Sequence, residues 1–261
     1  MATAGRVWEV LAVRYGTLQA TCGRLFFRWS DYGEPDAEQR LDFYFWVLRG
    51  DGETVLVDTG FDPEVAERRG RTPLCPPREA FARLAVTPSR VIVTHFHYDH
   101  VGNLSAFPDA QVWIPGRELE FWTSEPARRL QFAEHVEQRE IAHLVERHRA
   151  GRAVTYGDGD ELAPGVTAVA LPGHSPGQHG VLVRSASGPV LLASDAVHLY
   201  RELEQERPFG VIADLVAMYE SYARVRTAQA QGALFVPGHD PLVAARHPAV
   251  AGSDGLAIRL A

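Results

Sequence analysis

A short stretch places four potential metal ligands directly after an apolar run. Residues 91–93 are typical of a buried strand, and His95, His97, Asp99 and His100 follow within six residues. Side chains alternate along a strand, so His95 and His97 can point the same way where the strand ends. Imidazole and carboxylate together suit divalent zinc, iron or manganese. The stretch therefore predicts a metal site, which we favour over a polar turn without metal.

Length and composition limit the classes of protein that this chain can form. The chain has 261 residues, 46% of them hydrophobic, which suits one compact domain or a domain with an inserted cap. No apolar run is long enough for a membrane span, and no secretory signal is expected. Cys22 and Cys75 lie far apart, which favours a reducing cytoplasm over a disulfide framework. A net charge of −7 without a basic stripe argues against nucleic acid as a partner.

Hydrophobic periodicity predicts strands and helices in alternation. A charged segment over residues 117–150 is predicted to be a helical insertion near the mouth of the site. Residues 16–23 are either a loop or a strand. The other predicted strands are residues 7–13, 43–48, 54–57, 111–114, 166–170, 180–184, 190–193 and 234–236, and the other predicted helices are residues 77–86 and 211–226.

His or Asp also stands at three further predicted strand ends. His174 stands in a tight Gly-Pro turn, Asp195 ends a later strand, and His239 follows the last one. Strand ends on one edge of a sheet converge in space, and α/β architectures place their sites there. We therefore expect these side chains to join the first cluster. His135, His143 and His148, at irregular helical spacing among charged residues, are expected on the surface.

The pattern His-x-His-x-Asp-His at residues 95–100 resembles the metallo-β-lactamase superfamily. The resemblance implies an α/β fold, a four-layer αββα sandwich with two mixed sheets. It also implies a single domain over residues 1–261, with the helical insertion near the active site. Asp58, in an Asp-x-Gly turn, resembles the segment that supports the metals in this superfamily, although it can equally be a capping turn residue.

Carried over position by position, the resemblance implies two divalent metal ions. Zn²⁺ is the first candidate, with Mn²⁺, Fe²⁺ or Co²⁺ as alternatives. No cysteine lies near these segments, which disfavours a zinc β-lactamase with a Cys ligand. The implied ligands are His95, His97 and His174 for the first metal, Asp99, His100 and His239 for the second, and Asp195 as the bridge.

Residues 172–177, 194–197 and 238–240 look most like the N-acyl homoserine lactone lactonases, which are quorum-quenching enzymes. The resemblance implies a lactonase that opens a lactone or related ester by attack of a metal-bridging hydroxide, with Asp99 passing a proton to the leaving group. The family commonly has a tyrosine three residues after the bridging aspartate. Here that position is His198, which can donate a hydrogen bond to the substrate, and Tyr200 is the weaker substitute.

Three other functions stay open at this point. A thioesterase of the glyoxalase II type uses the same ligands, but no basic pocket for glutathione is evident. A phosphodiesterase suits the metals, although the acidic balance weakens it. A non-catalytic metal-binding domain would not need the complete ligand set. Aromatics at residues 26–32 either form a flap over the pocket or fill a core edge, and Phe121 and Trp122 are further candidates for holding the substrate.

Overall fold

The computed structural model describes residues 6–261, which form two mixed β-sheets. The first sheet has the strand order β13-β1-β2-β3-β5-β6-β7, with β4 on β1. Strands β3, β5, β6 and β7 are parallel, and β1, β2 and β3 are antiparallel. Its strands are β1 (Glu9–Thr21), β2 (Glu38–Gly50), β3 (Glu53–Val57), β4 (Thr72–Pro73), β5 (Arg90–Ile92), β6 (Gln111–Pro115), β7 (Ala153–Tyr156) and β13 (Ala257–Arg259).

The second sheet has the strand order β12-β11-β10-β9-β8. Its strands pair antiparallel except β11 and β12, which are parallel. Parallel pairing carries the end of β11 and the end of β12 to the same edge of the sheet. The strands are β8 (Glu161–Ala163), β9 (Val166–Ala170), β10 (His179–Ser185), β11 (Gly188–Ser194) and β12 (Leu234–Pro237).

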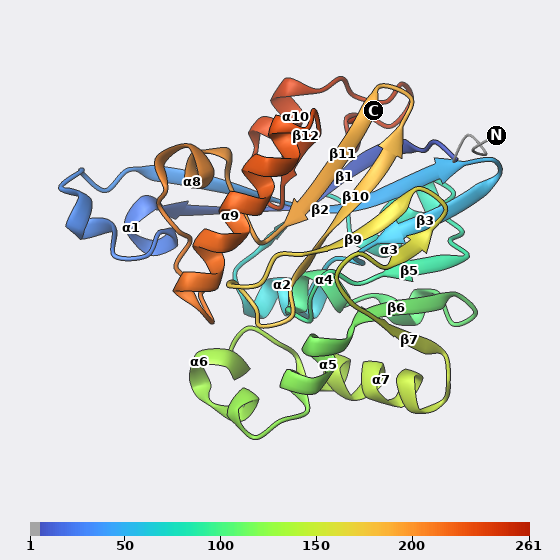
Figure 1. Ribbon diagram of the computed structural model, residues 1–261, viewed down its shortest axis with the longest axis horizontal. Coiled ribbons are helices and arrows are strands. Elements are labelled where there is room, and N and C mark those ends of the chain that lie inside the picture. The colour runs from blue at the N-terminus through green and yellow to red at the C-terminus, as the bar shows by residue number, and fades with distance from the viewer. Residues whose placement is uncertain (1–5) are drawn as a thin grey trace.

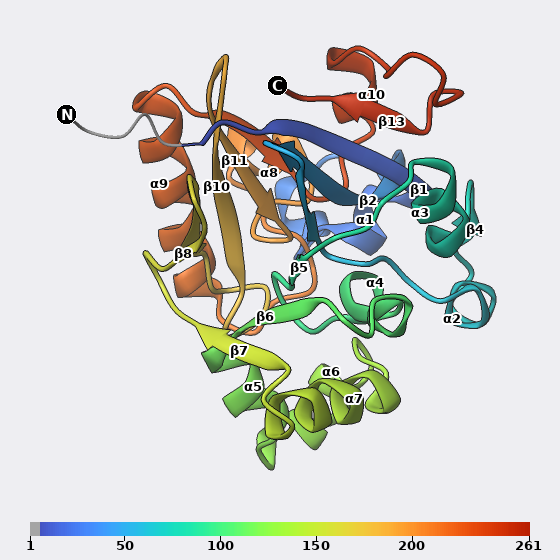
Figure 2. The same cartoon turned by 90° about the vertical axis from the view of Figure 1, so that its right-hand side faces the viewer.

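Helices cover the outer faces of both sheets. Figure 2 shows α9 outside the second sheet, and α2, α3 and α4 outside the first. The α-helices are α1 (Cys22–Leu25), α2 (Pro63–Arg68), α3 (Pro77–Arg83), α4 (Tyr98–Val101), α5 (Gly116–Trp122), α6 (Leu130–Ala133), α7 (Gln138–Arg149), α8 (Tyr200–Gln205), α9 (Leu215–Ala230) and α10 (Leu242–Arg246). Short 3₁₀ helices are η1 (Trp29–Tyr32), η2 (Leu104–Ala106) and η3 (Pro126–Arg128).

Two apolar cores hold the layers together. One core lies between the sheets, where Trp46 and Val57 of the first sheet belong to the same buried cluster as Val181 and Leu192 of the second. The other core lies between the first sheet and its helices. The fold is therefore the predicted four-layer αββα sandwich, and its layers can be followed in Figure 1. No helix within residues 6–261 combines the length and the apolar character that a bilayer crossing needs.

Several predicted boundaries were wrong, and two of them have a clear physical cause. Strand β1 does not end near Val13 but continues to Thr21, with a register shift between Arg14 and Gly16. Gly16 permits this continuation because an added Cβ would lie 2.6 Å from the ring of Phe61. Helix α9 begins at Leu215 and not at residue 211, because the Asp214 side chain caps it by accepting a hydrogen bond from the Ala217 amide.

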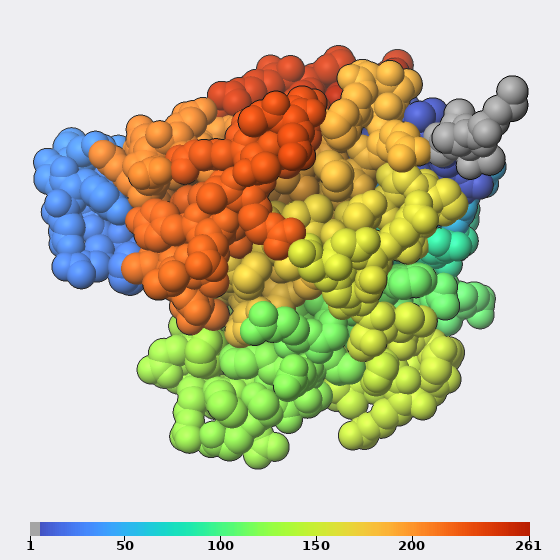
Figure 3. Space-filling view, in the orientation of Figure 1, coloured from blue at the N-terminus to red at the C-terminus, as the bar shows by residue number. Residues whose placement is uncertain are grey.

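The segment after β1 projects beside the segment that leads into α9. Figure 3 shows the blue residues of this segment next to the orange region of α8. The backbone amide of Phe27 donates to the Pro208 carbonyl, and the Gly210 amide donates to the Leu25 carbonyl. These contacts bring α1 to the edge where the predicted ligands gather.

We predict that Asn103→Ala destabilises the fold. The buried Asn103 amide donates to the carbonyl oxygens of Thr59, Gly60 and Phe61, and so ties the loop after β3 to the end of α4. The substitution leaves buried carbonyls without a donor, so the free energy of unfolding falls by about 1–3 kcal/mol. Urea unfolding measures it. A midpoint equal to that of the wild type would contradict this role.

Candidate metal centre

The structure brings the seven predicted ligands together at one edge of the two sheets. Their donor atoms form two groups, and within each group the atoms lie within 4.8 Å of one another. Each ligand follows a strand or lies in the turn beyond it. They are His95 and His97 after β5, Asp99 and His100 in α4, His174 after β9, Asp195 after β11 and His239 after β12.

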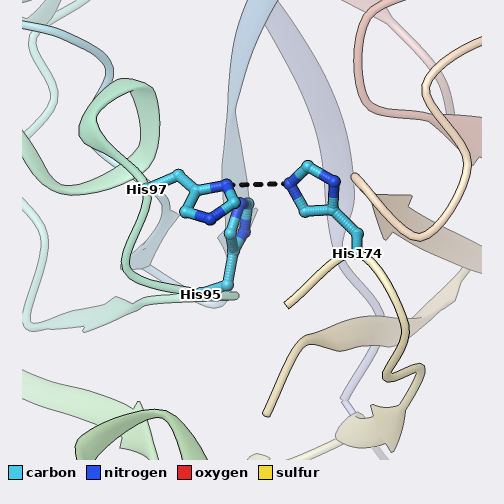
Figure 4. A group of neighbouring side chains, drawn as sticks. All are labelled: His95, His97 and His174. Atoms are coloured by element: carbon cyan, nitrogen blue, oxygen red, sulfur yellow. Dashed lines mark hydrogen bonds between the residues drawn. The ribbon is translucent and has the colours of Figure 1, made fainter. Parts of the chain in front are cut away.

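The first group consists of His95, His97 and His174. Figure 4 shows the three rings turned toward one another, with His97 Nδ1 and His174 Nε2 2.8 Å apart. The ring centroids of His95 lie 4.5 Å from His97 and 5.0 Å from His174. Three imidazole rings that converge in this way are a common ligand set for a divalent cation.

Asp195 lies between the first group and the second. One of its oxygens, Oδ2, lies 3.5 Å from His174 Nε2 and 3.9 Å from His95 Nε2. The other, Oδ1, lies 3.2 Å from His100 Nε2 and 3.0 Å from His239 Nε2. Burial opposes ionisation of this carboxyl, but the neighbouring histidines hold its pKa well below the ordinary value. Oδ2 also lies 3.1 Å from His239 Nε2, so this one carboxylate contacts both groups.

Glycines beside the ligands allow these close approaches. Gly173, which precedes His174, has φ +133°, and an added Cβ would lie 2.5 Å from the backbone of Met218. Gly238 precedes His239, and its Cβ would lie 2.7 Å from Asp195 Oδ1. A side chain at either position would push a ligand out of place.

Four ligand histidines are oriented by an acceptor outside the two groups. Each has an oxygen near Nδ1, which leaves the lone pair of Nε2 facing the interior of the site. The pairs are His95 with Thr94 Oγ1 at 3.2 Å, His100 with Asp58 Oδ2 at 2.7 Å, His174 with the Val211 carbonyl at 3.0 Å and His239 with the Asp42 carbonyl at 3.0 Å.

The donor atoms fit a divalent cation. Burial lowers the pKa of His95, His97 and His174 well below the ordinary value, so these rings are neutral. The Nε2 atoms of His95 and His100 are buried and have no hydrogen-bond partner among the described residues. Such orphaned groups cost about 1–3 kcal/mol each. A bound cation would accept the lone pair of His95 Nε2, and on His100, whose pKa the neighbouring carboxylates raise well above the ordinary value, it would take the place of a proton.

Asp58 contacts both ends of the ligand motif from behind. Its carboxylate accepts hydrogen bonds from the Thr94 amide and the Thr94 hydroxyl, each at 2.8 Å, and contacts His100 Nδ1 at 2.7 Å. Its backbone has φ +61°, an uncommon value for a residue other than glycine. Of the two interpretations of Asp58, the structure supports the one in which it orients a ligand.

Glu118 has a similar supporting position that the sequence did not reveal. Its buried carboxylate accepts from the Phe96 amide at 2.9 Å and Trp122 Nε1 at 2.7 Å, and from the Ser175 hydroxyl at 2.5 Å and the Gly177 amide at 2.7 Å. Burial raises the pKa of Glu118, and these donors oppose that shift. Glu118 thereby joins the turn of the first two histidines to the loop of the third.

His198 lies on the floor of the site. Its Nε2 is 3.3 Å from Asp195 Oδ2, its Nδ1 is 3.5 Å from Glu202 Oε1, and its ring stacks on Phe209 at 3.7 Å. Burial disfavours the charged ring, but the two carboxylates raise the pKa of His198 to about 9. Tyr200 lines a different surface depression and does not reach this position.

A cavity of about 190 Å³ lies above the ligands. Phe26 and Trp29 belong to the buried core at its edge, Tyr32 is exposed, and none of these aromatics lines the main cavity. Trp122 contacts His97 edge to face at 5.8 Å and lines an adjoining hollow. The walls of the main cavity are apolar at Leu18, Leu25, Leu41, Phe43, Phe209 and Val211, and polar at Arg24, Arg71, Tyr98 and His135.

His135, which was expected on the surface and not among the ligands, is half-buried and lines the cavity, but it belongs to neither group of ligands. Its ring lies 5.3 Å from the ring of His97. Helix α6 ends at Ala133 and α7 begins at Gln138, so His135 lies in a turn and helical spacing does not apply to it. The His135 carbonyl accepts a hydrogen bond from the Tyr98 amide, which fixes this turn against the site.

Comparison with protein families matches residues 44–242 to the metallo-beta-lactamase superfamily. The chain belongs to this superfamily. The matched residues contain all seven predicted ligands and both supporting carboxylates. Membership of the metallo-beta-lactamase superfamily agrees with the two mixed sheets and with the place of the site at their edge.

Curated relatives include lactonases. An N-acyl homoserine lactonase AttM from Azorhizobium caulinodans is 32% identical over 168 residues, which are 58% of this chain and 57% of that protein. The chain thus spans little more than half the length of this relative. An N-acyl homoserine lactonase from Bacillus thuringiensis is 27% identical over 224 residues, which are 79% of this chain and 84% of that one.

Solved structures share the fold. A quorum-quenching N-acyl homoserine lactone lactonase has a TM-score of 0.74 at 22% identity, covering 90% of this chain and 93% of its own. A probable metal-dependent hydrolase from Staphylococcus aureus has a TM-score of 0.70 at 13% identity, covering 90% of each chain. At these identities the likeness concerns the fold.

We predict that Glu118→Gln weakens metal retention. The new amide must point an N–H group at a donor, so the Phe96 and Gly177 backbones separate and the first group of histidines loosens. Loss of such a supporting contact lowers metal affinity by about 10- to 100-fold. Competition with a fluorescent chelator measures the affinity.

Glu140→Gln is the matched control, because Glu140 is also buried in the helical segment but contacts Arg139 and no ligand. Equal metal affinity in Glu118→Gln and in this control would contradict the supporting role of Glu118.

Proposed function

We propose that this protein is a dinuclear-metal hydrolase that opens the ring of a lactone, and that its substrate class is the N-acyl homoserine lactones or related lactones. The observation that carries the proposal is the pair of donor groups joined by Asp195 beneath a mainly apolar cavity. The names of the curated relatives support the same reaction. The wider family alone leaves the substrate open, because one fold hosts many reactions.

The seven ligands would hold two divalent cations. The first would take His95, His97 and His174, the second would take Asp99, His100 and His239, and Asp195 would bridge them. Nitrogen and carboxylate donors without sulfur suit Zn²⁺ first, and also Mn²⁺, Fe²⁺ or Co²⁺. When bound, two such cations supply a hydroxide nucleophile at neutral pH and a Lewis acid for a carbonyl oxygen.

Asp99 is the residue that we assign to proton transfer. Its carboxylate lines the cavity, with Oδ2 3.7 Å from His239 Nε2 and 3.8 Å from His100 Nε2. A carboxyl group at this edge can accept a proton as the tetrahedral centre forms and pass it to the departing alkoxide. The ring-opened product would then leave as a hydroxy acid.

His198 is the residue that we assign to orienting the substrate carbonyl. Glu202 accepts from the backbone amides of His198 and Leu199 at 3.0 and 2.9 Å, and it lies behind Nδ1. The stack on Phe209 keeps the ring plane fixed. Nε2 lies in the cavity lining beside Asp195 Oδ2, where it can donate a hydrogen bond to the carbonyl oxygen as negative charge develops there.

The setting of the enzyme is part of the proposal. Both cysteines, Cys22 and Cys75, are free and buried, which supports a reducing compartment, and we place the enzyme in the cytoplasm. We also propose a single domain, with residues 117–150 as a helical insertion between β6 and β7. Glu118 of that insertion contacts the ligand loops, which supports its role in shaping the site.

We predict that the purified protein releases acid from N-hexanoyl-homoserine lactone and that metal removal abolishes this release. Chelation takes away the nucleophile and the Lewis acid, and Zn²⁺ or Mn²⁺ restores them. A pH-indicator assay measures the rate, with a thioester and a phosphodiester assayed in parallel. Full activity in a metal-free sample, or turnover of the thioester or the phosphodiester without any lactone, would overturn the proposal.

We predict that His198→Phe lowers kcat by about 100-fold, since it removes a donor to the developing oxyanion while keeping a ring on Phe209. His198→Tyr restores a donor at this position and loses less. Steady-state kinetics on the same lactone measures both variants, and Tyr200→Phe is the control outside the cavity. Wild-type kcat in His198→Phe would show that this residue does not contact the reacting carbonyl.

A further inference from the structure

Arg71 is a cavity residue whose charge has no partner. Its Nε donates to the Tyr98 hydroxyl and its Nη1 to the Arg69 carbonyl, each at 2.8 Å. No carboxylate within residues 6–261 reaches ion-pair distance of its guanidinium, and its Nη2 makes no hydrogen bond to these residues. Arg71 is half-buried and lines the cavity above the ligands.

The neighbouring Arg69 also contacts Tyr98, but its positive charge is neutralised by a carboxylate. Its guanidinium lies 4.2 Å above the Tyr98 ring and pairs with Glu137 at 2.8 Å. Arg69 also donates to the Glu134 and Val136 carbonyls. Two arginines flank one tyrosine, and only Arg69 has an acid of this chain to neutralise it.

The Tyr98 hydroxyl adds a second free donor at the same spot. It accepts the hydrogen bond from Arg71 Nε, so its own proton points elsewhere, and no acceptor for that proton lies among residues 6–261. Tyr98 lines the cavity as well. A guanidinium and a hydroxyl that both lack an acceptor form a small site for an anion with several oxygens.

This donor pair lies close to the ligands. Phe43 lies between them, with its ring 4.9 Å from that of His239 and 5.9 Å from the Arg71 guanidinium carbon. Arg24, at the exposed rim, is a second arginine of the cavity without an ion pair among the described residues. Apart from these two arginines, the lining contains the carboxylates Asp99 and Asp195, which belong to the ligand set.

We propose that Arg71 and Tyr98 bind an anionic group of the substrate, so that the preferred substrate is a lactone that carries a carboxylate a few bonds from the reacting carbonyl. This inference rests on the proposed lactonase function and specifies its substrate class. The guanidinium fork takes two carboxylate oxygens, and the Tyr98 hydroxyl donates to one of them. The apolar walls hold the carbon chain between the carboxylate and the ring.

The test compares two probes of equal length and shape that differ in charge, N-succinyl-homoserine lactone and its neutral analogue N-succinamoyl-homoserine lactone. We expect the wild type to prefer the succinyl probe in kcat/KM by about 10- to 100-fold, mainly through KM. Arg71→Met brings this ratio toward one, and Arg71→Lys, which keeps the charge without the fork, gives an intermediate ratio. Arg78→Met, on the outer surface beside Ser105, leaves the ratio as in the wild type.

A ratio near or below one in the wild type, or a preference that survives Arg71→Met, would overturn the anion site while leaving the lactonase function intact. If neither lactone is hydrolysed, the proposed lactonase function is wrong. The anion site is then tested separately, by the binding of a simple anion. Butane-1-sulfonate, an anion that binds metals weakly, should then raise the Tm of the wild type but not of Arg71→Met. An equal shift in both proteins, or none in either, would contradict the anion site.

Discussion

The structure depends on burying five imidazoles and two carboxylates within a few ångströms of one another. Such groups lose hydration on folding, and each must find a partner or cost free energy. Four of the rings use Nδ1 to contact oxygens outside the cluster, which turns Nε2 inward. The inward atoms of His95 and His100 have no partner among the described residues. The cluster is therefore complementary to cations. The inward-facing nitrogen atoms that cost free energy on folding are the same atoms that would bind the metal.

Two carboxylates that do not belong to the ligand set fix the positions of the ligand loops. Asp58, at the end of β3, connects Thr94 to His100, and Glu118, at the start of α5, connects the Phe96 and Gly177 backbones. Each joins segments that are distant in sequence, so the geometry of the ligands is set by both sheets and by the helical segment. Supporting contacts of this kind orient ligands and tune a metal site.

Sequence patterns predicted which side chains converge at the edge of the sheets, but not which residues line the cavity, for physical reasons. Ligands stand at the ends of apolar strands, where alternation and turn residues are visible in a single chain. Glu118 has no such signal, because one buried acid among exposed charges on a helix breaks no periodicity. That His135 lines the cavity could not be predicted, because a turn interrupts the helical pattern there. The unpaired state of Arg71 depends on contacts across the fold, which no local pattern contains.

We propose that each chain binds two divalent cations through these seven side chains. Native mass spectrometry of the protein loaded with Zn²⁺ and then desalted tests it most directly. We expect a mass increase of two ions in the wild type and a loss of the two-ion species in Asp195→Ala, which lacks the bridge. A wild-type protein that holds one ion or none, or an Asp195→Ala variant that still holds two with unchanged affinity, would contradict it.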